Sequence, residues 1–205
     1  QCESRCIYHK MKKAPVAIGY LERYAADAEI SERRKAGREE EAPHSPKLGI
    51  KVAVAGSGPA GLSFAGEMAR RGFDVDVYEA LHEVGGVLKY GIPEFRLPNS
   101  VVDAELDALR RAGVKFHKDT VVGKTLSYDD LLATGAKGIF VASGAGLPRF
   151  MGIPGENYCG VVSSNEYLTR INLMGAGRPG YDTPAPRARR VAAVSYTHLT
   201  LPTIL

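Results

Sequence analysis

The 205-residue sequence contains no tryptophan, no long apolar run and only three cysteines. A small, odd number of cysteines argues against a disulfide framework and is typical of a reducing compartment. No apolar run approaches the roughly 20 residues that a membrane-spanning helix needs, and no signal-peptide pattern precedes the first expected domain. We therefore expect a soluble, cytoplasmic protein without a membrane partner.

The sequence also lacks a large excess of charge of either sign. Twenty-seven Lys and Arg residues stand against 23 Asp and Glu residues, which gives a net charge of +4. The densest charged run, residues 31–41, holds four charges of each sign and is typical of a solvated helix end or linker. Nothing in this pattern predicts a nucleic-acid partner.

The hydrophobic content of 44% is enough for one full core, and the chain divides near residue 42. Residues 15–30 place apolar side chains at helical spacing, which predicts an amphipathic helix; these are Ile18, Leu21, Ala25 and Ala28. The stretch APHSPKLG, residues 42–49, contains two prolines and a glycine and predicts a linker.

The second part of the chain begins with a pattern of strand, glycine turn, helix and strand. IKVAVAG (residues 50–56) is continuously apolar, helical spacing follows, and FDVDVYEA (residues 73–80) predicts the next strand. This is a βαβ unit of an α/β fold. GVKFHKDTVV and GIFVASGAG predict further strands, while Ser100 and Asp103 give a weak capping-box signal for another helix.

The glycine turn has the G-x-G-x-x-G spacing of a dinucleotide site. Gly56 permits a tight turn, Gly58 lets the backbone approach a pyrophosphate, and Gly61 allows close packing of the helix on the strand. The helix N-terminus offers free N–H groups to the phosphates. Glu79, at the end of the second strand, can accept hydrogen bonds from a ribose and would repel a 2′-phosphate, so we expect NAD or FAD here.

Later glycines favour FAD over NAD. Gly85 and Gly86 follow the second strand, where a simple dehydrogenase needs no further close backbone approach. A third glycine turn, residues 143–146, follows the strand in FVASGAG. Several close approaches suit a long ligand that lies extended across the sheet.

These motifs together resemble one family. GSGPAG, YEA with GGVLKYGIPEFRLP, and VASGAGLPRFMGIPGEN with SNEYLTRINLM are similar to the NADPH-dependent glutamate synthase small (beta) chain. They are also similar to its relatives, the flavin subunit of ferredoxin:NADP transhydrogenases and the N-terminal half of dihydropyrimidine dehydrogenase. The resemblance extends from Gln1 to about Val194.

The resemblance implies a Rossmann-like FAD-binding domain with particular contacts to the cofactor. The FAD phosphates would lie on the first glycine turn and the ribose on Glu79. The flavin end would lie near the second turn. Two further residues would contact the cofactor, one of them in the third glycine turn. The implied residues are Ser57, Gly58, Pro59, Ala60 and Gly61 for the phosphates, Gly85, Gly86, Val87 and Arg96 for the flavin end, and Val122 and Gly144 for the further contacts. Arg96 has the alternative interpretation of a surface arginine that packs on the neighbouring loop.

The same resemblance implies that the N-terminal helical domain holds iron–sulfur clusters. Cys2 and Cys6 match the last two cysteines of a cluster motif, and Glu22 falls at the position of the fourth ligand. Thiolates suit iron because soft sulfur binds it and balances the cluster charge. The first cysteine of that motif would precede residue 1, so we expect an incomplete ligand set for a 4Fe-4S cluster. We assign no role to Cys159 or to the histidines.

The domain division expected from these patterns has four parts: a partial helical iron–sulfur domain at 1–41, a linker at 42–49, an incomplete FAD-binding domain at 50–190, and 191–205. The last part begins as a strand, where the family starts its NADPH domain. Its final residues, SYTHLTLPTIL, fit neither structural period and resemble translated adaptor sequence. We therefore expect a fragment in which the NADPH site is missing.

The function implied is electron entry: NADPH reduces FAD, and electrons pass through clusters to a large catalytic subunit or fused domain. The flavin supplies the chemistry, so we name no catalytic side chain. Glutamate synthase is the leading interpretation, with a transhydrogenase or a pyrimidine reductase as alternatives. A thioredoxin-reductase-like enzyme would need a C-x-x-C pair, which is absent. The chain alone could also be a non-catalytic flavin-binding or docking module, unreactive with NADPH.

Overall fold

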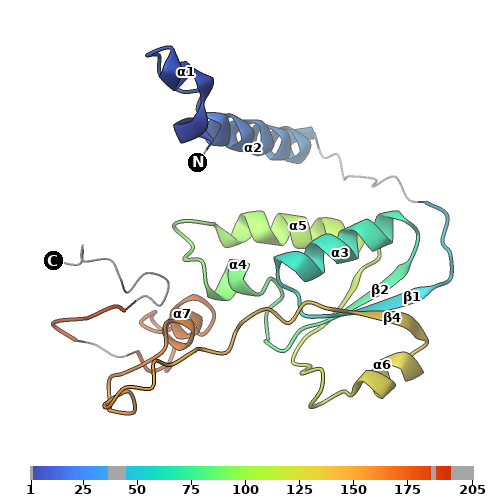
Figure 1. Ribbon diagram of the computed structural model, residues 1–205. Helices are drawn as coiled ribbons and strands as arrows, with labels where there is room; N and C mark the ends of the chain where they lie inside the picture. Colours follow the sequence, from blue (N-terminus) through green and yellow to red (C-terminus); the bar gives the residue numbers. More distant parts are fainter. Residues whose placement is uncertain (1, 37–44, 186–187, 195–205) are drawn as a thin grey trace. The chain divides into compact units, whose positions relative to one another are not determined.

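The computed structural model describes residues 2–36, 45–185 and 188–194 (Figure 1). The chain forms two compact units, Gln1–Ala42 and Pro43–Leu205. Among the residues described, no helix combines the length and the apolar character that crossing a membrane requires.

The first unit is helical. It contains a short 3-10 helix η1 (Glu3–Arg5), α1 (Ile7–Lys10) and the long α2 (Ile18–Ala36). The helix predicted for residues 15–30 is present, but it continues into the charged run. The side chains of Ile18 and Leu21, which the spacing assigns to an apolar face, are 40% and 59% exposed. The predicted face therefore forms but is not buried within this unit.

The second unit is built on a parallel four-stranded sheet with the order β3-β2-β1-β4 (Figure 1). The strands are β1 (Lys51–Ala55), β2 (Asp74–Tyr78), β3 (Lys115–His117) and β4 (Ala136–Val141). Val54 of β1 lies opposite Val77 of β2 and Phe140 of β4. This order and direction are those of a Rossmann-like fold, which confirms the predicted α/β class.

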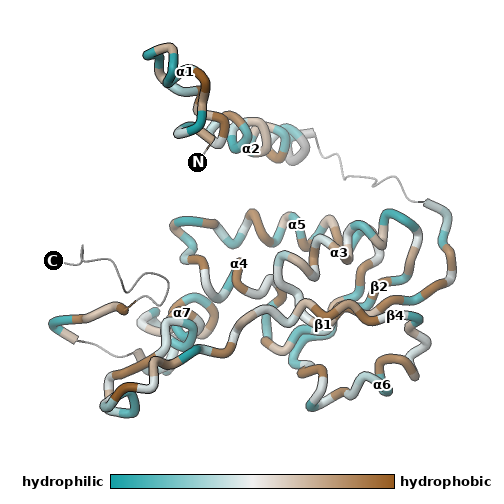
Figure 2. The backbone as a smooth tube through the Cα atoms, in the orientation of Figure 1, coloured by the Kyte–Doolittle hydropathy of each residue, from teal (hydrophilic) through white to brown (hydrophobic). Residues whose placement is uncertain are grey.

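Helices cover both faces of the sheet (Figure 1). α3 (Pro59–Arg70) and α5 (Asn99–Arg111) lie on one face and α6 (Tyr128–Ala133) on the other, whereas α4 (Val87–Tyr90) and α7 (Ser164–Asn172) contact each other outside the sheet. One core lies between the sheet and the α3 and α5 side, where Phe64 stacks on Phe140 with ring centroids 4.1 Å apart. A second core joins Tyr78 to Leu131 of α6. Figure 2 shows β1 and β4 as mainly hydrophobic, as burial between two helical layers requires.

Two local predictions are wrong. Ser100 and Asp103 do not form a capping box, because Pro98 is the N-cap of α5 and its side chain makes no capping hydrogen bond. A capping box forms instead at α6, between Ser127 and Asp130. The strand predicted to begin near residue 190 is also absent from residues 188–194, and its continuation lies outside the described residues.

Candidate functional site

The first glycine turn joins β1 to α3, and two of its glycines are required by packing. Gly56 has φ of +105°, and a Cβ there would overlap the backbone of Ala142, just after β4. A Cβ at Gly61 would overlap the carbonyl oxygen of Gly56. These positions therefore need glycine whether or not a ligand binds.

Gly58 differs from both. Its φ of −69° is open to any residue, and a Cβ there would meet no protein atom within 4 Å. It is the N-cap of α3, and Pro59 at the first helical position has no N–H to satisfy. The following N–H groups, those of Ala60 and Gly61, belong to a first turn that has no intrahelical acceptors. The arrangement is an open cradle that can receive an anionic group at a helix N-terminus.

A second glycine turn lies directly against this cradle. Gly85 and Gly86 have φ of +129° and +54°, and a Cβ at Gly86 would lie 2.8 Å from the Cα of Gly58. The N–H of Gly85 donates to Ser57 Oγ over 3.0 Å. The two glycine-rich segments that the sequence predicts to approach one ligand are therefore in contact with each other.

Glu79, directly after β2, is 6% exposed and is fixed by the same group of residues. Its Oε2 accepts hydrogen bonds from the Ser57 hydroxyl and from the Ser57 N–H, the latter over 3.0 Å. Its Oε1 accepts from the N–H of Leu81 over 2.9 Å. A carboxylate oxygen has two lone pairs, so Oε1 retains one acceptor position for a hydroxyl.

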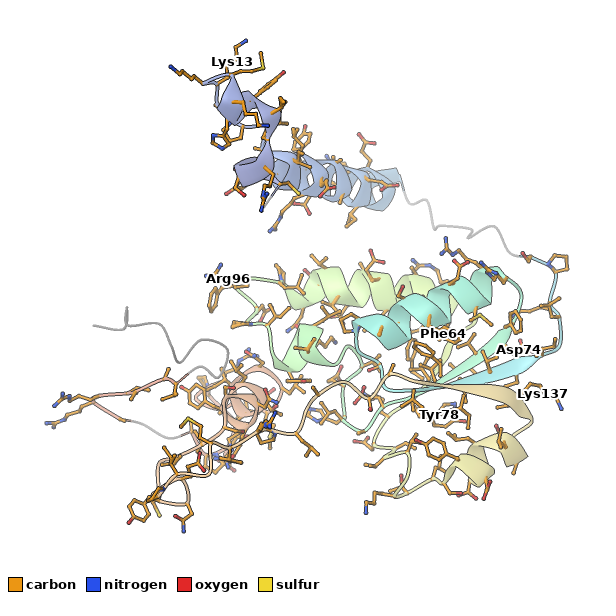
Figure 3. The ribbon with its side chains drawn as sticks, viewed as in Figure 1. Lys13, Phe64, Asp74, Tyr78, Arg96 and Lys137 are labelled. Atoms are coloured by element: carbon orange, nitrogen blue, oxygen red, sulfur yellow. The ribbon has the colours of Figure 1, made fainter. Side chains whose placement is uncertain are left out.

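The remaining residues predicted to bind the cofactor make none of these contacts with the first glycine turn or with Glu79. Arg96 is exposed, points away from the unit (Figure 3), and has its guanidinium 6.0 Å from the ring centre of Phe95, the preceding residue. Val87 is 41% exposed at the start of α4. Val122 packs on the core beneath α6, and Gly144 has φ of +67° with open space beside it. Their proposed roles beside a cofactor stay predictions.

Sequence reasoning missed two charged clusters. Lys89 is buried in α4 beside the second glycine turn, paired with carboxylates on both sides. The sequence signal was a lysine inside the otherwise apolar GGVLKYGIP. Asp76 of β2 is buried between Lys51 of β1 and His117 of β3. Burial alone would raise the pKa of Asp76, but hydrogen bonds and charge from His117 and Lys51 outweigh it and lower that pKa.

The predicted metal ligands do not form a site in the part of the chain described. Cys2 is exposed, Cys6 is half-buried, and both are free thiols. No group of three or more His, Cys, Asp or Glu side chains placed to hold a metal occurs among the described residues, and Glu22 is exposed on α2. These residues therefore do not fit a four-ligand iron–sulfur cluster in this structure.

Comparison with known proteins agrees with this geometry. The chain is 34% identical over 176 residues to the glutamate synthase [NADPH] small chain of Azospirillum brasilense, covering 86% of this chain and 36% of that protein. It is 39% identical over 152 residues to the NAD-dependent dihydropyrimidine dehydrogenase subunit PreT of Escherichia coli O157:H7, covering 73% and 35%. The resemblance to both groups that the motifs predicted is confirmed, and the chain spans about a third of either relative.

The solved structure of FprA from Mycobacterium tuberculosis matches at a TM-score of 0.53 and 22% identity, over 60% of this chain and 28% of that one. At that identity the match shows the fold alone. The family model described as pyridine nucleotide-disulphide oxidoreductase matches residues 50–179, the sheet, both glycine turns and Glu79 included. With that match over more than half of its length, the chain belongs to the pyridine nucleotide-disulphide oxidoreductase family.

Proposed function

We propose that this chain is part of an electron-entry flavoprotein, and that its α/β unit binds FAD. The observation that carries the proposal is Gly58, a glycine that neither backbone conformation nor protein packing requires. Its place at the N-terminus of α3 is where a dinucleotide pyrophosphate would meet free N–H groups.

Each part of the cradle has a role in binding. The first turn of α3 would hold the pyrophosphate through backbone N–H groups and the helix dipole. Glu79 would accept a hydroxyl of the adenosine ribose at the free position of Oε1, and its charge would exclude a 2′-phosphate. Ser57 keeps that carboxylate in place with two hydrogen bonds.

Held by the first turn of α3 and by Glu79, FAD would supply the redox chemistry, which is hydride acceptance from a reduced nicotinamide and release of single electrons. The chain itself would bind and orient the cofactor, and no side-chain acid or base is needed. We further propose that NADPH is the donor and that the acceptor is a large subunit or fused domain, as in a glutamate synthase. The support is the small-chain relative; PreT, matched over the same glycine turns, supports a pyrimidine reductase as the second candidate. An iron–sulfur relay at Cys2, Cys6 and Glu22 stays a prediction of the resemblance.

The test is FAD binding by the purified chain, followed by quenching of flavin fluorescence. We expect a stable complex in the wild type and an affinity lower by about tenfold or more in Glu79→Gln, because the ribose acceptor loses its charge. Glu79→Arg should bind still more weakly. Glu105→Arg is the matched control, since it makes the same charge change at an exposed position of α5. A wild type that binds no FAD, or a Glu79→Gln variant that binds as tightly as the wild type, would refute the assignment.

A further inference from the structure

Lys89 is unusual among the described lysines because its side chain is only about 10% exposed. Its ammonium group lies 2.7 Å from Asp103 Oδ1 of α5 and 3.2 Å from Glu83 Oε2, in the segment before the second glycine turn. Asp103 and Glu83 are themselves about half exposed. The lysine thus connects α4, α5 and the loop after β2 through one charge.

The charges of this cluster reinforce each other. Burial alone would lower the pKa of Lys89, but its hydrogen bonds to Asp103 and Glu83 and their negative charges outweigh that effect and raise it. Burial would likewise raise the pKa of Glu83, but hydrogen bonds from Lys89 and Lys118 lower it. Lys118 Nζ lies 3.3 Å from the other oxygen of Glu83 and is 44% exposed. The lowered pKa of Glu83 and the raised pKa of Lys89 both favour the ionised forms that make this ion pair.

The aliphatic part of Lys89 lies against the glycine turn. A Cβ at Gly85 would be 3.1 Å from Lys89 Cγ, so the lysine stem covers that face of the turn. On the other side, the Gly85 N–H is bonded to Ser57, and Gly86 lies against Gly58. A displacement of Lys89 would therefore move the turn that borders the phosphate cradle.

We propose that Lys89 is a positioning residue of the dinucleotide site, which holds the Gly85–Gly86 turn at the distance from Gly58 that leaves the cradle open. This inference rests on the proposed function. In this role Lys89 acts through the turn and not by its own contact with the cofactor. It fixes one wall of the cradle through its ion pairs with Glu83 and Asp103 and through the packing of its stem on Gly85.

The test compares FAD affinity with stability in a small set of variants of the full chain. Lys89→Met keeps the stem but removes the charge, and leaves the carboxylates of Glu83 and Asp103 facing each other. We expect FAD to bind about tenfold more weakly, and Lys89→Arg to recover most of the affinity. Asp103→Asn changes a half-exposed side chain to a neutral one of the same size and should give a smaller loss of about threefold.

Two controls separate positioning from general destabilisation. Lys118→Met removes the exposed partner of Glu83 and should leave FAD affinity unchanged. Val114→Ala trims the core on the α3 and α5 side, so it should lower the thermal midpoint without changing the affinity of the folded protein. The proposal is supported if the Lys89→Met and Asp103→Asn variants lose affinity while Val114→Ala, at a thermal midpoint as low as theirs, binds FAD as the wild type does.

The possible failures are distinguishable. If the wild type binds FAD and Asp103→Asn and Lys89→Met bind it equally well, the inference is wrong and the proposed function stands. The inference is also overturned if Val114→Ala, at the same thermal midpoint, loses as much affinity as the Lys89 variants do. If Lys89→Met does not fold, Asp103→Asn and Lys89→Arg decide the matter by the same comparison. A wild type that binds no FAD overturns both.

Discussion

At the scale of single residues, the glycines of one turn have different reasons to be glycine. Gly61 lacks a side chain because a Cβ would overlap the carbonyl oxygen of Gly56, whereas nothing in the protein occupies the space beside Gly58. Stability and ligand binding should therefore respond separately to the two substitutions.

We expect Gly58→Ala to change the free energy of unfolding by less than about 0.5 kcal/mol, since a poorer N-cap is offset by lower unfolded-chain entropy. The same variant should bind FAD at least about tenfold more weakly, because the methyl group enters the cradle. Gly61→Ala should lose about 1–3 kcal/mol of stability through overpacking. Urea unfolding of both variants measures the stability change, and titration with FAD measures the affinity. Equal stability losses in the two variants would contradict the argument.

At the scale of an element, α6 depends on its N-terminal cap. Ser127 Oγ accepts the N–H of Asp130 over 3.1 Å, and the Asp130 carboxylate accepts the N–H of Ser127 over 2.8 Å. Hydrogen bonds from Ser127 lower the pKa of Asp130. The cap holds a six-residue helix whose Leu131 is fully buried in the second core.

Ser127→Ala should therefore lower the free energy of unfolding by about 1 kcal/mol, the usual cost of losing an N-cap. Ser100→Ala is the control, because Ser100 lies inside α5 and caps nothing, and alanine is the better helix former. Denaturant unfolding should show a loss in the first variant and none in the second. A loss in Ser100→Ala of the same size would mean that the capping assignment is wrong.

At the scale of the whole molecule, the sheet is tied across three strands by one buried charge. Asp76 of β2 lies 3.3 Å from Lys51 Nζ of β1 and 2.8 Å from His117 Nε2 of β3. His117 also stacks on Tyr78 with ring centroids 4.6 Å apart. Because the pKa of Asp76 is lowered in the folded protein, its ionised form stabilises the fold at pH values above the ordinary aspartate pKa of 3.8.

The stability that Asp76 contributes should be fully present above about pH 4 and lost as pH falls through its lower folded pKa. Asp76→Asn should lower the free energy of unfolding at pH 7 by about 1–3 kcal/mol and weaken this acid dependence. Asp74→Asn is a control in the same strand, since its pair with Lys47 is exposed and worth little. Unfolding curves between pH 3 and pH 7 test this; an unchanged acid dependence in Asp76→Asn would count against it.

The sequence by itself determined the βαβ order, the parallel sheet, the first glycine turn and the family, because these depend on local apolar period and on glycine spacing along the chain. It failed at the start of α5, where Pro98 replaces the expected serine cap, since a weak local signal cannot show where the chain enters a helix. It also placed an apolar face on α2 that is exposed within its own unit.

Tertiary structure alone decided which residues meet. The contact of Gly86 with Gly58, the hydrogen bonds from Ser57 to Glu79, and the burial of Lys89 between two carboxylates all join segments that are apart in the chain. Neither the apolar period nor the glycine spacing of the sequence predicts such contacts, because they depend on how β2, α4 and α5 pack on the first turn. Sequence thus determined the elements of the candidate site, and packing determined which glycine is left open for a ligand.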